Sequence, residues 1–87
     1  MNVSETLDKR GKTYGEYTRV GIVSQNLKDI LRSGASWSMT EPYMRESLDM
    51  LCNKLSRIVN GNPYYADSWH DIAGYATLVE VELNKGK

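Results

Sequence analysis

The stretch MRESLDMLCNKLSRI, residues 44–58, decides the fold class. Its large apolar residues recur at intervals of four, three, four and three, the spacing of one face of an α-helix. They are Met44, Leu48, Leu51, Leu55 and Ile58. We expect this helix to begin at residue 40 or 41, where Pro42 suits the first turn. It should end at the segment Asn60-Gly61-Asn62-Pro63.

A helix of the same kind is expected on each side of this one. The earlier helix runs from about Glu16 to Ser33, and Gly34 follows where a C-terminal glycine is common. The later helix begins around Ser68, which forms a capping-box pattern with Asp71. Both carry an apolar stripe at helical spacing: Val20, Val23, Leu27, Ile30 and Leu31 in the first, and Trp69, Ile72, Ala76, Val79 and Leu83 in the second.

The first residues of the chain predict a shorter helix. It covers Ser4 to Arg10, with Ser4 as its N-cap. A defined turn over Arg10–Gly15 should follow, because two glycines flank a basic and an aromatic residue there. No segment shows the sustained alternation of a strand. The sequence therefore predicts one all-α domain, residues 1–87, built as a small bundle of three to four helices.

The length of the chain predicts a homo-oligomer. A domain of 87 residues buries only about 60–65% of its unfolded surface, so a monomer would be marginally stable. The last helix also carries a second stripe opposite its apolar one: Asp67, Asp71, Gly74, Leu78 and Val81. A solvent-facing stripe seldom combines a glycine with two large aliphatic residues, so we expect it to pack on another subunit.

The composition excludes several classes of protein. Eleven basic and eleven acidic residues balance, whereas a binder of long nucleic acid or of membrane surfaces shows a basic excess. No apolar run approaches the ~18–20 residues of a membrane span. The first residues have no apolar core of a signal peptide. The single cysteine, Cys52, rules out an intrachain disulfide. We therefore expect a cytoplasmic protein.

The basic residues suggest a site for an anion. Arg10 and Lys12 lie beside glycines, where backbone N–H groups could add donors to phosphate oxygens. Lys54 and Arg57 lie one helical turn apart and could address one anion together. Aromatic rings for stacking on a base are available at Tyr14, Trp69 and Tyr75, and Asp71 lies among them. We predict that these eight residues bind a ligand and that none is catalytic.

Two alternatives compete with this anion site. In the first, Lys54 and Arg57 simply pair with Asp67 and Asp71 across a helical hairpin. In the second, carboxylates of neighbouring helices hold Mg²⁺, which prefers oxygen ligands and a bridging phosphate. The candidate carboxylates are Glu46 and Asp49 on one helix and Asp67 and Asp71 on the next.

The segments RGKTYGEY (Arg10–Tyr17) and Lys54–Glu80, the latter with DIAGYATL (Asp71–Leu78), resemble a family of small phage and prophage proteins. That family is distantly similar to the MazG-like, all-α nucleoside triphosphate pyrophosphohydrolases. The resemblance implies helical oligomers and a Mg²⁺ site at Glu46, Asp49 and Asp71. Ser68 stands where the family has a liganding Glu, and metal-assisted hydrolysis needs a full carboxylate set. A nucleotide pocket without catalysis is therefore expected.

Three functions remain open at this point. The leading one is non-catalytic sequestration of a small phosphorylated nucleotide, in a pocket shared between subunits. A cyclic nucleotide signal of bacterial immunity is one candidate, because phages encode small oligomeric sponges of similar size; such a protein would work in the host cell cytoplasm. The alternative is a divergent MazG-like pyrophosphohydrolase. The third is an interaction module that places Met50, Leu78 and Val81 on a host protein.

Overall fold

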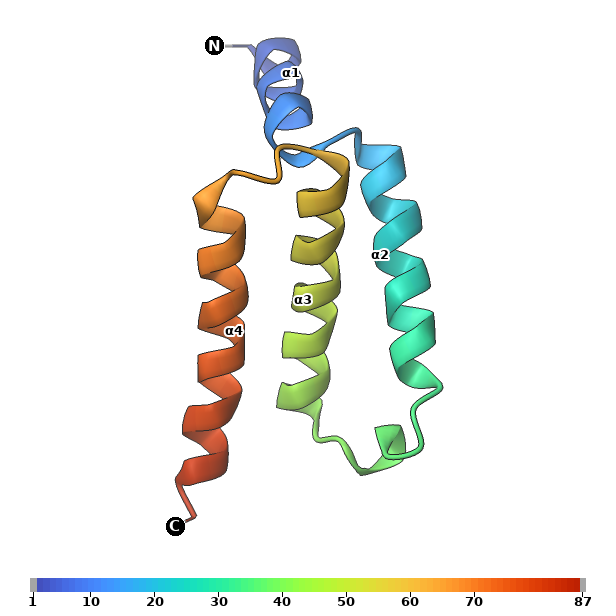
Figure 1. The fold of residues 1–87 in the computed structure, drawn as a ribbon, viewed down its shortest axis with the longest axis vertical. Helices are drawn as coiled ribbons and strands as arrows, with labels where there is room; N and C mark the ends of the chain where they lie inside the picture. Colours follow the sequence, from blue (N-terminus) through green and yellow to red (C-terminus); the bar gives the residue numbers. More distant parts are fainter. Residues whose placement is uncertain (1, 87) are drawn as a thin grey trace.

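The computed structural model describes residues 2–86, which form four α-helices and one short 3-10 turn (Figure 1). No strand occurs among these residues, so the all-α prediction is confirmed. None of the described helices is both long enough and apolar enough to cross a membrane. The elements are α1 (Val3–Tyr14), α2 (Tyr17–Arg32), η1 (Trp37–Met39), α3 (Pro42–Asn60) and α4 (Ala66–Asn84).

Two predicted helix starts and one predicted turn are wrong. Helix α1 is capped by Asn2, whose side-chain oxygen accepts a hydrogen bond of 2.9 Å from the Glu5 amide, so Ser4 is inside the helix. The helix continues through Gly11 to Tyr14, and only Gly15 leaves helical geometry. Helix α4 begins at Ala66, and Ser68 is a buried helical residue that packs inward instead of capping.

Helices α2, α3 and α4 form a single layer with α3 in the middle (Figure 1). Helix α3 packs against α2 on one side and against α4 on the other. Helix α1 extends beyond one end of this layer and contacts α2 and α3 there. Residues 2–86 therefore form no second layer of helices that could cover the broad faces of the first.

Small side chains make the contacts between neighbouring helices. Ser56 of α3 is fully buried, and its hydroxyl donates a 2.7 Å hydrogen bond to the Val20 carbonyl of α2. Ser47, about half a helical turn round α3 from Ser56, is buried on the side of α4. Ser24, Cys52 and Ser68 are buried as well. Small residues let the helix axes approach closely, but they bury little apolar surface.

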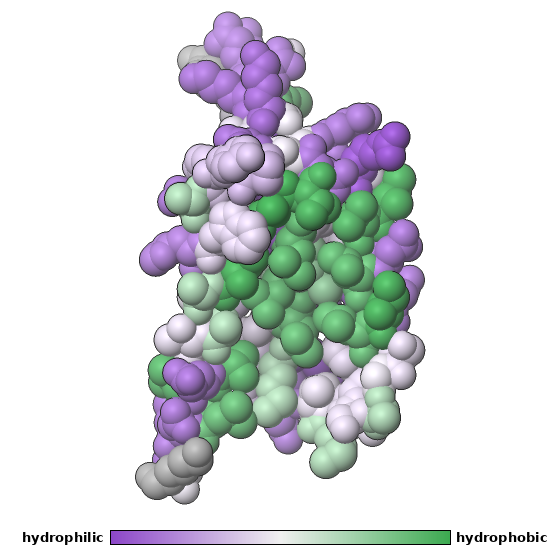
Figure 2. All heavy atoms as spheres, in the orientation of Figure 1, coloured by the Kyte–Doolittle hydropathy of each residue, from purple (hydrophilic) through white to green (hydrophobic). Residues whose placement is uncertain are grey.

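The large apolar side chains lie on one broad face of the layer, which we call the apolar face. Figure 2 shows it as a continuous hydrophobic patch over α2 and α3. Leu55, at the middle of α3, is 41% exposed. Of the stripes that the sequence marks as the core, Val20 and Ile58 are buried, while the other members are half-buried or exposed. The apolar face is defined by Leu27, Ile30, Leu48, Leu55, Val59 and Leu83.

Candidate functional site

The ends of α1 and α3 meet through backbone atoms. Gly15 adopts φ 91°, and a Cβ atom on it would collide with the carbonyl group of Asn60. A Cβ atom on Gly61 would collide with the backbone of Thr13 and Tyr14. The Asn62 amide donates a 2.9 Å hydrogen bond to the Thr13 carbonyl. These contacts set the position of Tyr14 over the C-terminal turn of α3.

Tyr14 is the centre of a cluster of aromatic and cationic side chains. The Arg10 guanidinium carbon lies 5.0 Å from the centre of the Tyr14 ring, and that of Arg57 lies 4.6 Å from it. Tyr65 meets the same ring edge-on, with 5.7 Å between ring centres and an interplanar angle of 86°. The spacing of Arg10 and Tyr14, four residues on one helix, puts their side chains on one face of α1.

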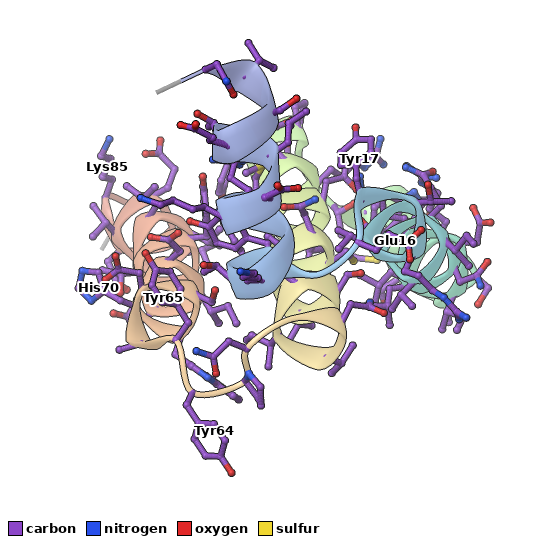
Figure 3. All side chains as sticks on the ribbon, turned by 90° about the horizontal axis from the view of Figure 1, so that it is seen from above. Glu16, Tyr17, Tyr64, Tyr65, His70 and Lys85 are labelled. Carbon is purple, nitrogen blue, oxygen red and sulfur yellow. The ribbon has the colours of Figure 1, made fainter. Side chains whose placement is uncertain are left out.

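A groove of about 470 Å³ opens beside this cluster between α1, α2 and α3. We call it the arginine groove. It lies on the polar face of the layer, because Asn53 and Arg57 are each two residues, or about 200°, round α3 from Leu55. Tyr17 at this groove and Tyr64 point to opposite sides of the layer in Figure 3. The lining residues are Leu7, Arg10, Gly11, Tyr14, Gly15, Glu16, Tyr17, Val20, Asn53 and Arg57.

The charge of the arginine groove is not neutralised by ion pairs. Neither Arg10 nor Arg57 forms a salt bridge with another residue of the described segment 2–86. One carboxylate, Glu16, lines the groove against these two guanidinium groups. A planar guanidinium presents paired N–H donors that match phosphate and carboxylate oxygens. The groove is therefore suited to an anion with oxygen acceptors.

The two predicted lysines lie elsewhere. Lys12 is exposed and does not line the groove, because it is two residues round α1 from Arg10. The ammonium group of Lys54 lies 3.2 Å from the Asp71 carboxylate, and its side chain is only 13% exposed. The alternative of ion pairs between neighbouring helices therefore holds for Lys54, which pairs with Asp71. It does not hold for Arg57, for which no ion pair occurs within residues 2–86. Asp67 instead accepts a 3.3 Å hydrogen bond from the Tyr65 hydroxyl.

Three further candidate ligand residues also lie outside the arginine groove. The Trp69 indole donates a 2.9 Å hydrogen bond to the Pro63 carbonyl. Asp71 and Tyr75 line a second, open hollow along α4 together with His70, Gly74 and Leu78. His70 points away from the rest of the layer in Figure 3. The structure thus brings together Arg10, Tyr14 and Arg57 and separates them from the other five predicted residues.

The carboxylates of the metal alternative are not gathered either. Asp49 lies 3.8 Å from Arg32, and Asp71 pairs with Lys54, while Glu46 is exposed. Within residues 2–86, no group of three or more His, Cys, Asp or Glu side chains is placed to hold a metal ion. The side chains of Glu46, Asp49 and Asp71 are therefore not gathered at one point of the described structure.

Three polar or aromatic residues of the groove are not among the predicted ligand residues: Glu16, Tyr17 and Asn53. Asn53 precedes Arg57 by four residues, so helical spacing could have placed it beside that arginine. Glu16 and Tyr17 follow the Gly15 turn directly and could have been found from it. The Tyr17 ring is 88% exposed and free to stack on a flat ligand.

The titration of two nearby groups is shifted by their surroundings. A hydrogen bond with the adjacent Tyr14 phenol, with a smaller effect of Asp67, raises the pKa of Tyr65 above its ordinary value. Burial, helped by the charge of Asp49, raises the pKa of the Cys52 thiol. Neither group is activated as a nucleophile.

Comparisons with known proteins give no assignment. No family model matches the chain, and searches of curated proteins and of solved structures find no match to it.

Proposed function

We propose that this chain binds a small phosphorylated nucleotide in the arginine groove and does not cleave it. The observation that carries the proposal is the placement of Arg10 and Arg57 against one tyrosine ring with no ion pair to either. Two like charges on one ring repel each other, and an anion bound between them would remove that repulsion. Arginine is the side chain best suited to bidentate contact with phosphate.

The dimensions of the groove support a nucleotide. Pockets for small molecules and cofactors have volumes of about 300–1,000 Å³, and the arginine groove has about 470 Å³. Its lining combines apolar Leu7 and Val20 with the polar Asn53 amide and the exposed Tyr17 ring. In this arrangement the arginines contact phosphate, Tyr17 stacks on the base and Asn53 hydrogen-bonds to the ligand.

The absence of a gathered carboxylate set supports binding over hydrolysis. A Mg²⁺-dependent pyrophosphohydrolase needs several carboxylates at one metal, and Asp49 and Asp71 are instead paired with basic side chains. Sequestration of a nucleotide, a cyclic immune signal among the candidates, requires only the groove. We also propose that the chain acts as a homo-oligomer, because a single copy leaves its largest apolar side chains at the surface.

The proposal is tested with a panel of linear and cyclic nucleotides. Each is incubated with the protein and Mg²⁺, the protein is heat-denatured, and the released nucleotide is identified by chromatography. Recovery of unchanged ligand supports sequestration. A monophosphate product would make the chain a pyrophosphohydrolase. Retention of none of the panel would contradict nucleotide binding and leave interaction with a host protein as the function to examine.

Two arginine variants locate the site by calorimetry with a nucleotide that binds. Arg57→Ala should weaken binding by at least tenfold, about 1.4 kcal/mol, because a charge-assisted hydrogen bond is lost. Arg19→Ala is the control, because Arg19 is exposed on α2 and does not line the groove. Circular dichroism checks that both variants fold. Equal weakening by the two variants would point to a general charge effect and not to this groove.

A further inference from the structure

We infer that the apolar face is the surface by which two copies of this chain associate, one layer of helices on the other. The inference gives the assembly part of the proposed function a location, and it does not depend on any ligand. In such a dimer, the leucine stripes of α3 from both copies form the shared core. The arginine grooves lie on the opposite face of each layer and remain open to solvent.

The exposed surface area of the chain is larger than that of a compact monomer, which supports a contact with another molecule. The chain exposes 6425 Å², whereas a compact monomer of its mass is expected to expose about 5,200 Å². The excess of roughly 1,200 Å² is more than the ~800 Å² that each partner buries in an interface of standard size. Helix α1, which extends beyond the layer, and the uncovered apolar face both add to the exposed area (Figures 1 and 2).

The dimensions of the chain lead to the same result. Its radius of gyration is 15.0 Å, whereas a compact domain of 87 residues is expected to have one of about 12 Å. Among the residues that the structure describes, three apolar ones are buried: Val20, Cys52 and Ile58. A core of that size is too small for an independently stable domain, so most of the apolar burial must come from a partner.

The chemistry of the apolar face indicates a second copy as that partner. The six residues that define it are all aliphatic, so their side chains can meet those of an identical face across a two-fold axis without repulsion between like charges. The face offers no charged pattern that would select a different protein. A second copy is also the one partner present wherever the chain itself is made.

Light scattering on the purified wild-type chain tests the association. We expect a mass of at least twice the 9.9 kDa of one chain at micromolar concentration. The midpoint of urea unfolding should rise with protein concentration, as it does for obligate dimers. Leu55→Glu, at the middle of the face, should raise the dissociation constant at least about 100-fold, because it buries unpaired charges. Leu78→Glu is the contrasting variant. Leu78 lines the hollow along α4 and belongs to the stripe that the sequence predicts as the subunit contact, so on this inference its substitution should leave the mass unchanged.

Thiol labelling keeps the test decisive if Leu55→Glu fails to fold. Leu55→Cys and Leu78→Cys are made in the natural chain, whose buried Cys52 serves as the unlabelled reference. A polar maleimide should modify Cys at position 78 at least tenfold faster than Cys at position 55. Equal labelling rates, a monomeric wild type, or dissociation by Leu78→Glu but not by Leu55→Glu would overturn the inference. Loss of nucleotide binding with the dimer intact would affect only the proposed function.

Discussion

The contact between the ends of α1 and α3 makes a sharp prediction about Gly61. The Gly61→Ala substitution adds one methyl group where the Thr13 carbonyl and the Tyr14 backbone already lie. Gly61 has φ −118°, outside the left-handed region, so the prediction rests on the space that the added methyl group needs. Overpacking of this kind costs about 1–3 kcal/mol. The 2.9 Å hydrogen bond from the Asn62 amide to Thr13 is strained by the same displacement.

The matched control is Gly11→Ala, three residues before Tyr14, the last residue of α1. Nothing lies within 4 Å of the position of a Cβ atom on Gly11, and the residue is helical. Alanine there should stabilise the chain by about 0.5–1 kcal/mol, because glycine is a poor helix former. The same type of substitution should therefore have opposite signs at the two positions.

Urea unfolding followed by circular dichroism measures both variants, at one protein concentration. For a domain of this size, a change of 1 kcal/mol in the free energy of unfolding corresponds to a shift of about 4–8 °C in Tm. Displacement of Tyr14 in Gly61→Ala should also lower the affinity of the arginine groove for a nucleotide. If Gly61→Ala unfolds at the same urea concentration as the wild type, the backbone contact does not position α1 and the reasoning fails.

Two further outcomes are expected. Ser56→Ala should lower the free energy of unfolding by about 0.5–1.5 kcal/mol, because the fully buried Ser56 hydroxyl donates to the Val20 carbonyl. A change smaller than the error of urea titration would show that this hydrogen bond does not stabilise the packing of α2 on α3. Because burial raises the pKa of Cys52, its thiolate fraction at pH 8 is smaller in the folded chain than in the unfolded one. Labelling by a thiol reagent at pH 8 should therefore be at least about tenfold slower without urea than with it, and equal rates would contradict the burial.

Helical periodicity predicts α2, α3 and α4 well, because the repeat of three and four is set by helix geometry whatever covers the stripe. The same periodicity misplaces the core. A stripe marks the largest apolar surface of a helix, but of the stripe residues only Val20 and Ile58 are buried. The other buried positions are four serines and Cys52. Small residues leave no periodic apolar signal, so the packing seams of α3 cannot be read from hydropathy.

The candidate site is predictable only where its geometry is local. Arg10 and Tyr14 meet because they are four residues apart on one helix, which becomes clear once α1 is known to extend to Tyr14. The contact of Arg57 with Tyr14 depends on how α1 packs on the end of α3. That packing requires glycine at both position 15 and position 61. Lys54 lies on the side of α3 that faces α4, where it pairs with Asp71 and not with the groove.

The central position of α3 has a consequence for the order in which the chain folds and opens. Each of its packed sides is filled by a helix adjacent in sequence, so the contacts of α2 and α4 with α3 form by closure of short loops. Such sequence-local contacts favour rapid folding, on the microsecond to millisecond scale. Either outer helix can detach while the other stays docked, so amide hydrogens of α3 should exchange more slowly than those of α2 and α4.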